Sequence, residues 1–569
     1  MDRTGSRWFS RAPDRGTPAL VLFALLSLFI LFNDLGGAAL SEPDEGRNAE
    51  IAREILLVND WITPHYDFTP RLDKPIFFYV LTALSYKLFG ISEWTARLPS
   101  ALSGLGGVLL TYLFARALLG PWAALWSGLI LVTCAEYAAF GRLVMLDMSL
   151  NLFVVLALFS FYWATLADGK RKKRAYYLLM YASMGCATLI KGPFGFVVPG
   201  MIIFAYILIQ RRWSILAEME WIWGALVFVL IVAPWYAWAE MRNPGYLRYF
   251  LADEHFLRFF TPHFRRTKPW YFFPALLAGG FFPWTLLLPG LIRRLWKRSL
   301  DDLSLYLILW TLLPPIFFSL SSSKMPEYIL PVFPALSILA GRTIVELLAG
   351  ASQRSGTLSL PWQTLNLLLL YFVAGIVWPG LLPEILREPI LQVPQMPVAF
   401  TVILLLAFVL LPLTAWIAFF RQRRLFVAGC MAFGLVFLAS QRAFELVATT
   451  RSSKELANRA APFLRPADQI VIYDTFLAGL PFYLRVEKPI WMVWPGKKSN
   501  VMGSVYVAQK TPQPAPGYGQ ALFTFEEFSK QWNESDRRLL VFIKEKNLSQ
   551  LDRPRELLQV GQIVLATNR

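Results

Sequence analysis

Cysteine is scarce in this chain, with three among 569 residues, and histidine is equally rare. Cys134, Cys186 and Cys430 all fall inside apolar runs, which excludes a disulfide framework and a thiolate metal site. Charged residues make up only 16%, and the tail beyond about residue 451 lacks a glycine-rich phosphate loop, zinc-ligand spacing and heptads. Membrane topology explains the basic residues better than nucleic acid does, so we predict no nucleic-acid partner.

Hydrophobic residues are abundant instead, at 56% of the chain, with 15% aromatic residues and a mean hydropathy of +0.47. A membrane-spanning helix needs roughly 20 mostly apolar residues. We therefore predict a polytopic α-helical integral membrane protein with about thirteen transmembrane helices. The expected spans are 18–40, 97–118, 121–138, 148–166, 175–190, 194–210, 221–238, 271–292, 303–320, 329–349, 361–383, 397–419 and 425–441. A cleavable signal peptide is the alternative for the first run, but its length favours a span.

Basic clusters predict the orientation, because short cytoplasmic loops are rich in lysine and arginine. With a cytoplasmic N-terminus, the clusters at 170–174, 211–212, 293–298 and 421–424 all fall on the inner side. An odd number of spans then places the region from about 451 on the outer side. One outer loop runs against this rule, with Arg242, Arg248, Arg258, Arg265, Arg266 and Lys268. An anionic substrate or lipid headgroup at the outer surface and an ordinary solvated loop explain it equally well.

Two domains are expected: a transmembrane domain at 1–450, whose first outer loop is 41–96, and a small extracytoplasmic α/β domain at 451–569. The loop is longer than a helix connection needs, which is typical of functional loops. "SEPDEGRNAEIAREILL" predicts an amphipathic helix on the outer leaflet, and "IFFYVLTALSYKLFG" a second interfacial or re-entrant helix. In the tail, "SSKELANRAAPFL" predicts a helix, and short strands are expected at "QIVIYDTF", "PFYLRV", "PIWMVW", "SVYVA", "LLVFIK" and "IVLAT".

Carboxylates at the predicted membrane edge are functional candidates, because burying them there is costly unless they face a cavity or a partner. Asp44 stands with Glu42 and Glu45 at the start of the first loop, and Asp147 stands alone among apolar residues at the start of the fourth span. Each could instead cap its own helix. Because the predicted topology puts both on the outer side, holding a divalent cation or orienting a leaving group is favoured over two independent caps.

Basic residues of the outer loops are candidates for binding phosphate. They lie in the segments "LDKP" with Asp73 and Lys74, "IKGP" with Lys191, and "SSSKMPEY" with Lys324, Glu327 and Tyr328. A lysine extended to the membrane surface is the alternative for each. In "ADEHF", Glu254 and His255 could bind a metal together with Asp44, although a lone histidine is more often structural.

The first loop resembles that of a known family. "SEPDEGRNAEIAREIL", "DWITPHYDFTPRLDKPIFFYVLTALSYKLFG" and "EWTARLPSAL" are similar to the first-loop signature of C-type-fold glycosyltransferases that use polyprenyl-phosphate sugars. Within them the chain looks most like the bacterial lipid A 4-amino-4-deoxy-L-arabinosyltransferases, which are related to protein mannosyltransferases. The resemblance implies that Asp44, Asp147 and Lys74 are catalytic. Lys74 corresponds to the basic residue of the family's Glu-Lys-Pro motif, which here reads Asp73-Lys74-Pro75 with a shorter carboxylate.

This resemblance also implies the substrates. The donor would be undecaprenyl-phosphate-linked aminoarabinose and the acceptor a phosphate of lipid A, at the periplasmic face of the bacterial inner membrane, giving resistance to polymyxin. Since a phosphate acceptor is already ionised, Asp44 is expected to organise a metal, the sugar or the phosphates and not to take a proton. Substrate-binding residues would be Arg47, Asp73, Lys191, Arg265, Arg266, Lys268, Lys324 and Tyr328. We expect a monomer surrounded by membrane lipids. A related enzyme moving mannose or galacturonic acid to a protein or glycolipid is the alternative, and a lipid transporter is less favoured.

Overall fold

The computed structural model describes residues 17–258, 268–297, 300–351, a few positions between 427 and 438, 448–496 and 501–569. The chain falls into two compact units. The helical unit comprises 1–35, 100–232 and 257–447, and the loop unit comprises 36–99, 233–256 and 448–569. The loop unit is therefore built from three segments that lie far apart in the sequence.

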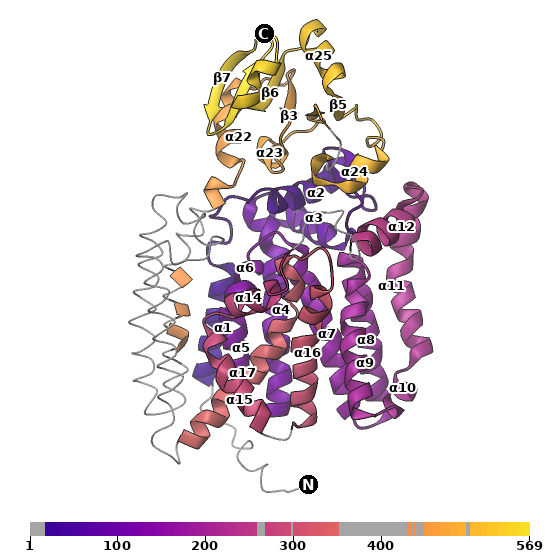
Figure 1. Ribbon diagram of the computed structural model, residues 1–569, viewed down its shortest axis with the longest axis vertical. Helices are drawn as coiled ribbons and strands as arrows, with labels where there is room; N and C mark the ends of the chain where they lie inside the picture. The colour runs from indigo at the N-terminus through magenta and orange to yellow at the C-terminus, as the bar shows by residue number, and fades with distance from the viewer. Residues whose placement is uncertain are drawn as a thin grey trace. The chain divides into compact units, whose positions relative to one another are not determined.

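The helical unit consists of long apolar helices, as expected of a chain whose backbone must satisfy its own hydrogen bonds in lipid. Within it, α7 packs against α8, α5 against α17, and α9 against α8 and α16 (Figure 1). Its described elements are α1 (Thr17–Phe32), α5 (Pro121–Thr133), α6 (Ala135–Phe140), α7 (Leu146–Leu166), α8 (Lys170–Lys191), α9 (Phe194–Gln210), α10 (Ser214–Glu218), α14 (Phe272–Gly280), η3 (Trp284–Leu287), α15 (Leu288–Lys297), α16 (Asp302–Ser319), η4 (Pro326–Ile329) and α17 (Val332–Ala351). Two further helices, α4 (Glu93–Leu119) and α11 (Trp221–Arg242), continue from one unit into the other.

Within the described residues, four helices are long and apolar enough to cross a membrane, namely α4, α7, α11 and α16. On α11 the large side chains of Ile222, Val229 and Leu230 are more than half exposed, which suits hydrocarbon and not water. The polytopic helical fold is thus supported. The spans expected at 361–383 and 397–419 lie outside the described residues, as does most of 425–441, so the total of thirteen stays a prediction.

Three predicted spans are corrected. The first helix ends at Phe32 and does not reach residue 40. The span at 121–138 is two helices, because Cys134 is extended and the next amide, of Ala135, donates to the carbonyl of Phe282 (3.1 Å). The span at 271–292 is likewise interrupted after α14, where Pro283 lacks the N–H that would continue the helix. Hydropathy alone does not locate such breaks.

In the loop unit, the residues of the first loop form α2 (Asp44–Val58), the two-residue strands β1 (His65–Tyr66) and β2 (Thr69–Pro70), and α3 (Phe77–Phe89). The segment at 246–257 adds α12 (Tyr246–Arg248) and a π-helical turn, η1 (Tyr249–Leu257). The helix predicted at 44 is confirmed, but not its amphipathic surface position. Ten residues of α2 are buried, among them Glu45, Glu50, Arg53 and Glu54, because α3, β1 and α23 pack around it.

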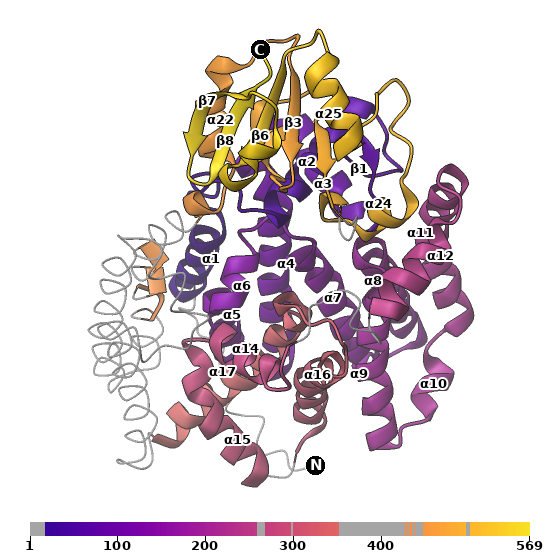
Figure 2. The same ribbon diagram turned by 45° about the horizontal axis from the view of Figure 1, so that its top comes forward.

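The C-terminal segment forms a six-stranded sheet in the order β5-β4-β3-β6-β8-β7. The first four strands are parallel, and β8 runs antiparallel to both β6 and β7. Figure 2 shows β7, β8, β6 and β3 side by side. The helix α25 packs against β5 and β4. Phe528 and Trp532 of α25 pack with Val471, Val541 and neighbouring strand residues into one core.

The elements of this segment are α22 (Lys454–Ala460), η6 (Ala461–Phe463), β3 (Gln469–Tyr473), α23 (Leu480–Leu484), β4 (Trp491–Trp494), η7 (Val501–Gly503), α24 (Val505–Lys510), β5 (Leu522–Thr524), α25 (Phe525–Glu534), β6 (Leu539–Lys544), η8 (Glu545–Gln550), β7 (Arg555–Val560) and β8 (Ile563–Thr567). The helix expected at "SSKELANRAAPFL" is present as α22. Two expected strands are wrong, since "PFYLRV" contains α23 and "SVYVA" contains α24. Ser504 caps α24 by accepting from the Val507 amide, which favours the helix over the strand that the β-branched residues predicted.

Candidate functional site

Asp44 is the first residue of α2, and its carboxylate lies beside the guanidinium of Arg47. It is not at the capping position before the helix, and its Oδ1 accepts from Arg47 Nη2 at 2.6 Å. The Asp44 side chain is 43% exposed, whereas that of Arg47 is largely covered. Burial opposes the guanidinium charge, but the Asp44 carboxylate overcomes this and raises the pKa of Arg47. The start of α2 thus presents a reachable carboxylate joined to a permanent positive charge.

The neighbouring carboxylates of the same sequence cluster have structural partners. Glu42 accepts from the amides of Ala478 and Gly479, both at 2.8 Å. Glu45 is buried and pairs with Arg97 (2.9 Å). Glu42 and Glu45 thus have partners that hold the loop in place, whereas the Asp44 side chain is 43% exposed, and its catalytic role stays a prediction.

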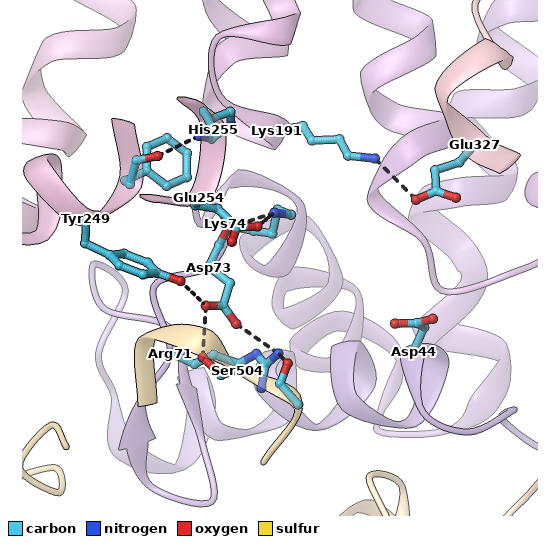
Figure 3. A network of polar contacts seen from close by, with 12 residues as sticks. Asp44, Arg71, Asp73, Lys74, Lys191, Tyr249, Glu254, His255, Glu327 and Ser504 are labelled. Carbon is cyan, nitrogen blue, oxygen red and sulfur yellow. Dashed lines mark hydrogen bonds and ion pairs between the residues drawn. The ribbon is translucent and has the colours of Figure 1, made fainter. Parts of the chain in front are cut away.

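Asp73 and Lys74 follow the β1–β2 hairpin in the loop unit. The Asp73 carboxylate accepts from the Tyr249 and Ser504 hydroxyls, each at 2.9 Å, and pairs with Arg71 at 3.0 Å (Figure 3). Lys74 Nζ donates to Glu254 Oε1 at 2.7 Å. This is a short, charge-assisted hydrogen bond, and the Glu254 carboxylate orients the Lys74 ammonium.

Two residues of the predicted metal site, Glu254 and His255, have contacts within the protein. Glu254 is paired with Lys74, and His255 Nδ1 lies 2.7 Å from the carbonyl oxygen of Phe250. Within the described part of the chain, no three histidine, cysteine, aspartate or glutamate side chains come together as a metal-binding group. The set of Asp44, Glu254 and His255 is not gathered there, and the metal requirement stays a prediction.

The second cluster lies in the helical unit, where α8 meets α7. Asp147 is in the first turn of α7, and its carboxylate accepts from Lys191 Nζ at the last residue of α8. Gly192, with a φ of 79°, ends α8 immediately after this lysine. Lys191 Nζ also lies 3.6 Å from Glu327 Oε1 and 5.0 Å from the centre of the Tyr328 ring. Asp147 and Lys191, 44 residues apart, thus form a buried ion pair with a second carboxylate and an aromatic ring beside it.

Four other predicted substrate-binding residues are Arg265, Arg266, Lys268 and Lys324. Arg265 and Arg266 lie outside the described residues. Lys324 Nζ donates to the backbone carbonyl of Lys268 at 3.1 Å, and the Lys268 side chain is exposed. The structure brings these two segments together, while their predicted binding of substrate stays a prediction.

Sequence reasoning missed several polar residues of the two units. Arg71, Tyr249 and Ser504 contact Asp73 in the loop unit, and Glu136 in the helical unit is buried with both carboxylate oxygens lacking a hydrogen-bond partner among the described residues. Arg71 was adjacent to a recognised motif and could have been found from it. Tyr249 and Ser504 lie 176 and 431 residues from Asp73, and no local pattern connects them to it.

Comparison with known proteins adds to this geometry. Residues 42–250 match the family model described as dolichyl-phosphate-mannose-protein mannosyltransferase. Three similar proteins are named undecaprenyl phosphate-alpha-4-amino-4-deoxy-L-arabinose arabinosyl transferase. That of Erwinia tasmaniensis is 35% identical over 56% of this chain and 58% of its own length, and that of Enterobacter sp. is 33% identical over 58% and 60%. That of Pseudomonas paraeruginosa is 32% identical over 66% and 67%. The chain therefore matches about three fifths of the first two relatives and two thirds of the third.

The fold is similar to a solved structure over almost its entire length. ArnT from Cupriavidus metallidurans bound to undecaprenyl phosphate superposes with a TM-score of 0.84 at 25% identity, covering 97% of this chain and 98% of that one. The same protein in the apo state gives a TM-score of 0.83 at 26% identity. The structural likeness thus covers a larger share of the chain than the sequence matches do.

Proposed function

Since the chain belongs to the family of the undecaprenyl phosphate-4-amino-4-deoxy-L-arabinose arabinosyl transferases, we propose that it transfers this amino sugar from undecaprenyl phosphate to a phosphate of lipid A. The similarity to the Pseudomonas relative over two thirds of both chains carries the proposal. The superposition on ArnT, a protein solved with undecaprenyl phosphate, supports the donor. The finer parts of the proposal are thirteen spans, a cytoplasmic N-terminus, a periplasmic C-terminal region and a monomer in the inner membrane.

The reaction would exchange one phosphate for another at the anomeric carbon. A lipid A phosphate oxygen forms the new bond, the bond to the donor phosphate breaks, and undecaprenyl phosphate leaves with the electron pair. The acceptor is already an anion at neutral pH, so it needs no strong base. The main demand on the protein is to hold two phosphates that repel each other and to stabilise the charge that develops on the leaving group.

Cations paired with carboxylates meet this demand. Arg47 beside Asp44, Lys74 beside Glu254 and Lys191 beside Asp147 each combine a positive charge with an acid that orients it. We assign Asp44 to hold Arg47 and to contact the sugar, with Lys74 and Lys191 as phosphate ligands. The exposed position of Asp44 and its hydrogen bond to Arg47 support this role over that of a base.

The test is mass spectrometry of lipid A from cells that lack their own aminoarabinose transferase. Cells expressing this protein should carry the aminoarabinose adduct, and cells expressing Asp44→Ala at the same level should lose it by at least about a hundredfold, as when an electrostatic catalytic group is removed. Glu455→Ala, on the exposed surface of α22, is the control and should leave the adduct unchanged. No adduct with the wild type contradicts the substrate, and a full adduct with Asp44→Ala contradicts the role of Asp44.

A second candidate follows from the mannosyltransferase family model over 42–250, namely transfer to a hydroxyl of a protein or glycolipid. A hydroxyl acceptor must lose its proton, so Asp44 would then act as a base. The isosteric change Asp44→Asn separates the two candidates. Hydroxyl transfer would be abolished, whereas phosphate transfer should keep residual activity.

A further inference from the structure

Both oxygens of the Asp73 carboxylate have partners within the same chain. Its Oδ1 accepts from the Tyr249 and Ser504 hydroxyls, and its Oδ2 faces Arg71. Asp73 as a whole is only 9% exposed. Burial, together with the nearby Asp73 carboxylate, raises the pKa of Tyr249, so the phenol keeps the proton that it donates. A carboxylate with these three partners has little capacity left for a ligand.

The C-terminal segment also holds Arg71. The guanidinium donates to the carbonyls of Met502 (2.6 Å) and Gly503 (2.7 Å), in the turn that ends at Ser504. Gly503 has a φ of 66°, and a Cβ at this position would approach Phe476 to 2.9 Å, so the turn requires glycine here. Residues 502–504 therefore hold Arg71 through two carbonyls and Asp73 through one hydroxyl.

Lys74 depends directly on this arrangement. Its Nζ donates to the backbone carbonyl of Asp73 (2.9 Å) as well as to Glu254 (2.7 Å). Fixing Asp73 fixes the carbonyl and the Cα position from which the lysine side chain extends. Tyr249 and Glu254 both belong to η1, so one short element positions the carboxylate of Asp73 and the ammonium of Lys74.

We propose that Asp73 is a positioning residue, and that Tyr249 and Ser504 hold it so that Lys74 is placed to bind phosphate. This assigns the C-terminal region a part in building the site, through a turn 431 residues away in sequence. The inference rests on the proposed function for the role of Lys74, but not for the geometry of the cluster. It replaces a direct role of Asp73 as a substrate ligand, because such a role would require the carboxylate to give up its donors.

The test is the pair of changes Ser504→Ala and Tyr249→Phe in the full-length protein. Each removes one donor to a charged group, and we expect kcat to fall about tenfold or more with KM for the donor lipid changed less than about threefold. Ser504→Thr keeps the hydroxyl and should restore activity. Ser529→Ala in α25 and Tyr518→Phe, whose ring stacks on Phe68 at 4.2 Å, are matched controls that should behave as wild type.

Ser504 also caps α24, so loss of the cap must be separated from loss of the contact with Asp73. A double-mutant cycle with Asp73→Ala, which removes the acceptor, does this: if the contact matters, Ser504→Ala adds little to Asp73→Ala, whereas a loss of the cap would add in full. Wild-type kcat in both Ser504→Ala and Tyr249→Phe, or full additivity in the cycle, would overturn the proposal.

Hydrogen–deuterium exchange gives a readout that does not depend on the substrate. Amides of residues 71–77 should exchange faster in Ser504→Ala and Tyr249→Phe than in Ser529→Ala and Tyr518→Phe. If the wild type transferred no aminoarabinose but Ser504→Ala and Tyr249→Phe still raised the exchange rates, the proposed function would be wrong and the positioning role of Asp73 would stand. If the wild type and both variants transferred aminoarabinose and the exchange rates of residues 71–77 did not change, the positioning role of Asp73 would be rejected and the proposed function would stand.

Discussion

The ion pair between Glu45 and Arg97 is the clearest place to measure what holds the first loop together. Arg97 Nε and Nη2 donate to the two oxygens of Glu45 at 2.9 and 3.1 Å, and the side chains are 1% and 2% exposed. Arg97 also donates to the carbonyls of Ala38 (2.7 Å) and Ala39 (3.1 Å). These contacts fix the start of α2, which carries Asp44 and Arg47.

The perturbation is Arg97→Met, which keeps the length of the side chain and removes its charge. Glu45 would then lose its buried cationic partner and keep neutral donors such as the amide and hydroxyl of Ser41, both at 3.0 Å. Removing one partner of a buried ion pair costs about 3–5 kcal/mol. The free energy of unfolding of the loop unit should fall by that amount, which is a factor of roughly 100 to 5,000 in its equilibrium constant.

Replacing both partners should cost less than replacing one. In Glu45→Leu/Arg97→Met no charge is left buried, so part of the loss should be recovered, although the carbonyls of Ala38 and Ala39 still lose their donor. The control is Arg459→Met in α22, whose pair with Glu455 at 2.8 Å is exposed and should contribute about 0.5 kcal/mol or less.

The assay is pulse proteolysis in detergent across a urea titration, following cleavage in residues 36–99. A cost below about 1 kcal/mol for Arg97→Met would refute the assignment of a buried pair. So would a double variant as unstable as the sum of the two single ones, because the calculation depends on the uncompensated charge.

Two further predictions concern single buried groups. Asp67 Oδ1 accepts from the Ile490 amide, Oδ2 meets no donor among the described residues, and burial raises the pKa of this carboxyl well above 3.8. A carboxyl whose pKa is raised by folding contributes stability that is full below 3.8 and is lost as the pH rises through its pKa in the folded protein. Asp67→Asn should therefore stabilise the loop unit by about 1–3 kcal/mol at pH 8 and by less toward pH 4, measured by the same proteolysis. An equal effect at both pH values would contradict this. Lys191→Met leaves Asp147 without its main partner and should lower kcat by about a hundredfold or more, whereas Lys191→Arg should keep part of it. Transfer within tenfold of wild type in Lys191→Met, assayed on lipid A, would exclude Lys191 from the reaction.

The predictions of fold from sequence succeeded where a single periodic or apolar run decides the structure. The expected spans at 148–166, 194–210 and 303–320 correspond to α7, α9 and α16 to within two residues at each end. They failed where tertiary contacts decide. The break at Cys134 involves a hydrogen bond to Phe282, and α23 and α24 formed in segments whose β-branched and aromatic residues favour strands.

For the site, the sequence identified residue types but not partners. The pairing of Asp44 with Arg47 follows from three-residue spacing on a helix. The pairing of Lys74 with Glu254 joins residues 180 apart, and nothing in either local sequence specifies it. The prediction of an amphipathic surface helix was wrong for α2, because its charged residues are covered by the nearby α3 and β1 and by α23, which is remote in sequence.

The interleaved loop unit also has a consequence for biosynthesis. Glu42 leaves the ribosome early, but the amide of Ala478 that it accepts from is made 436 residues later. At about 5–20 residues per second, that delay is roughly 20 to 90 seconds. During this interval the nascent first loop carries acids whose native donors do not yet exist, so the last fifth of the chain to be translated controls when the loop can mature.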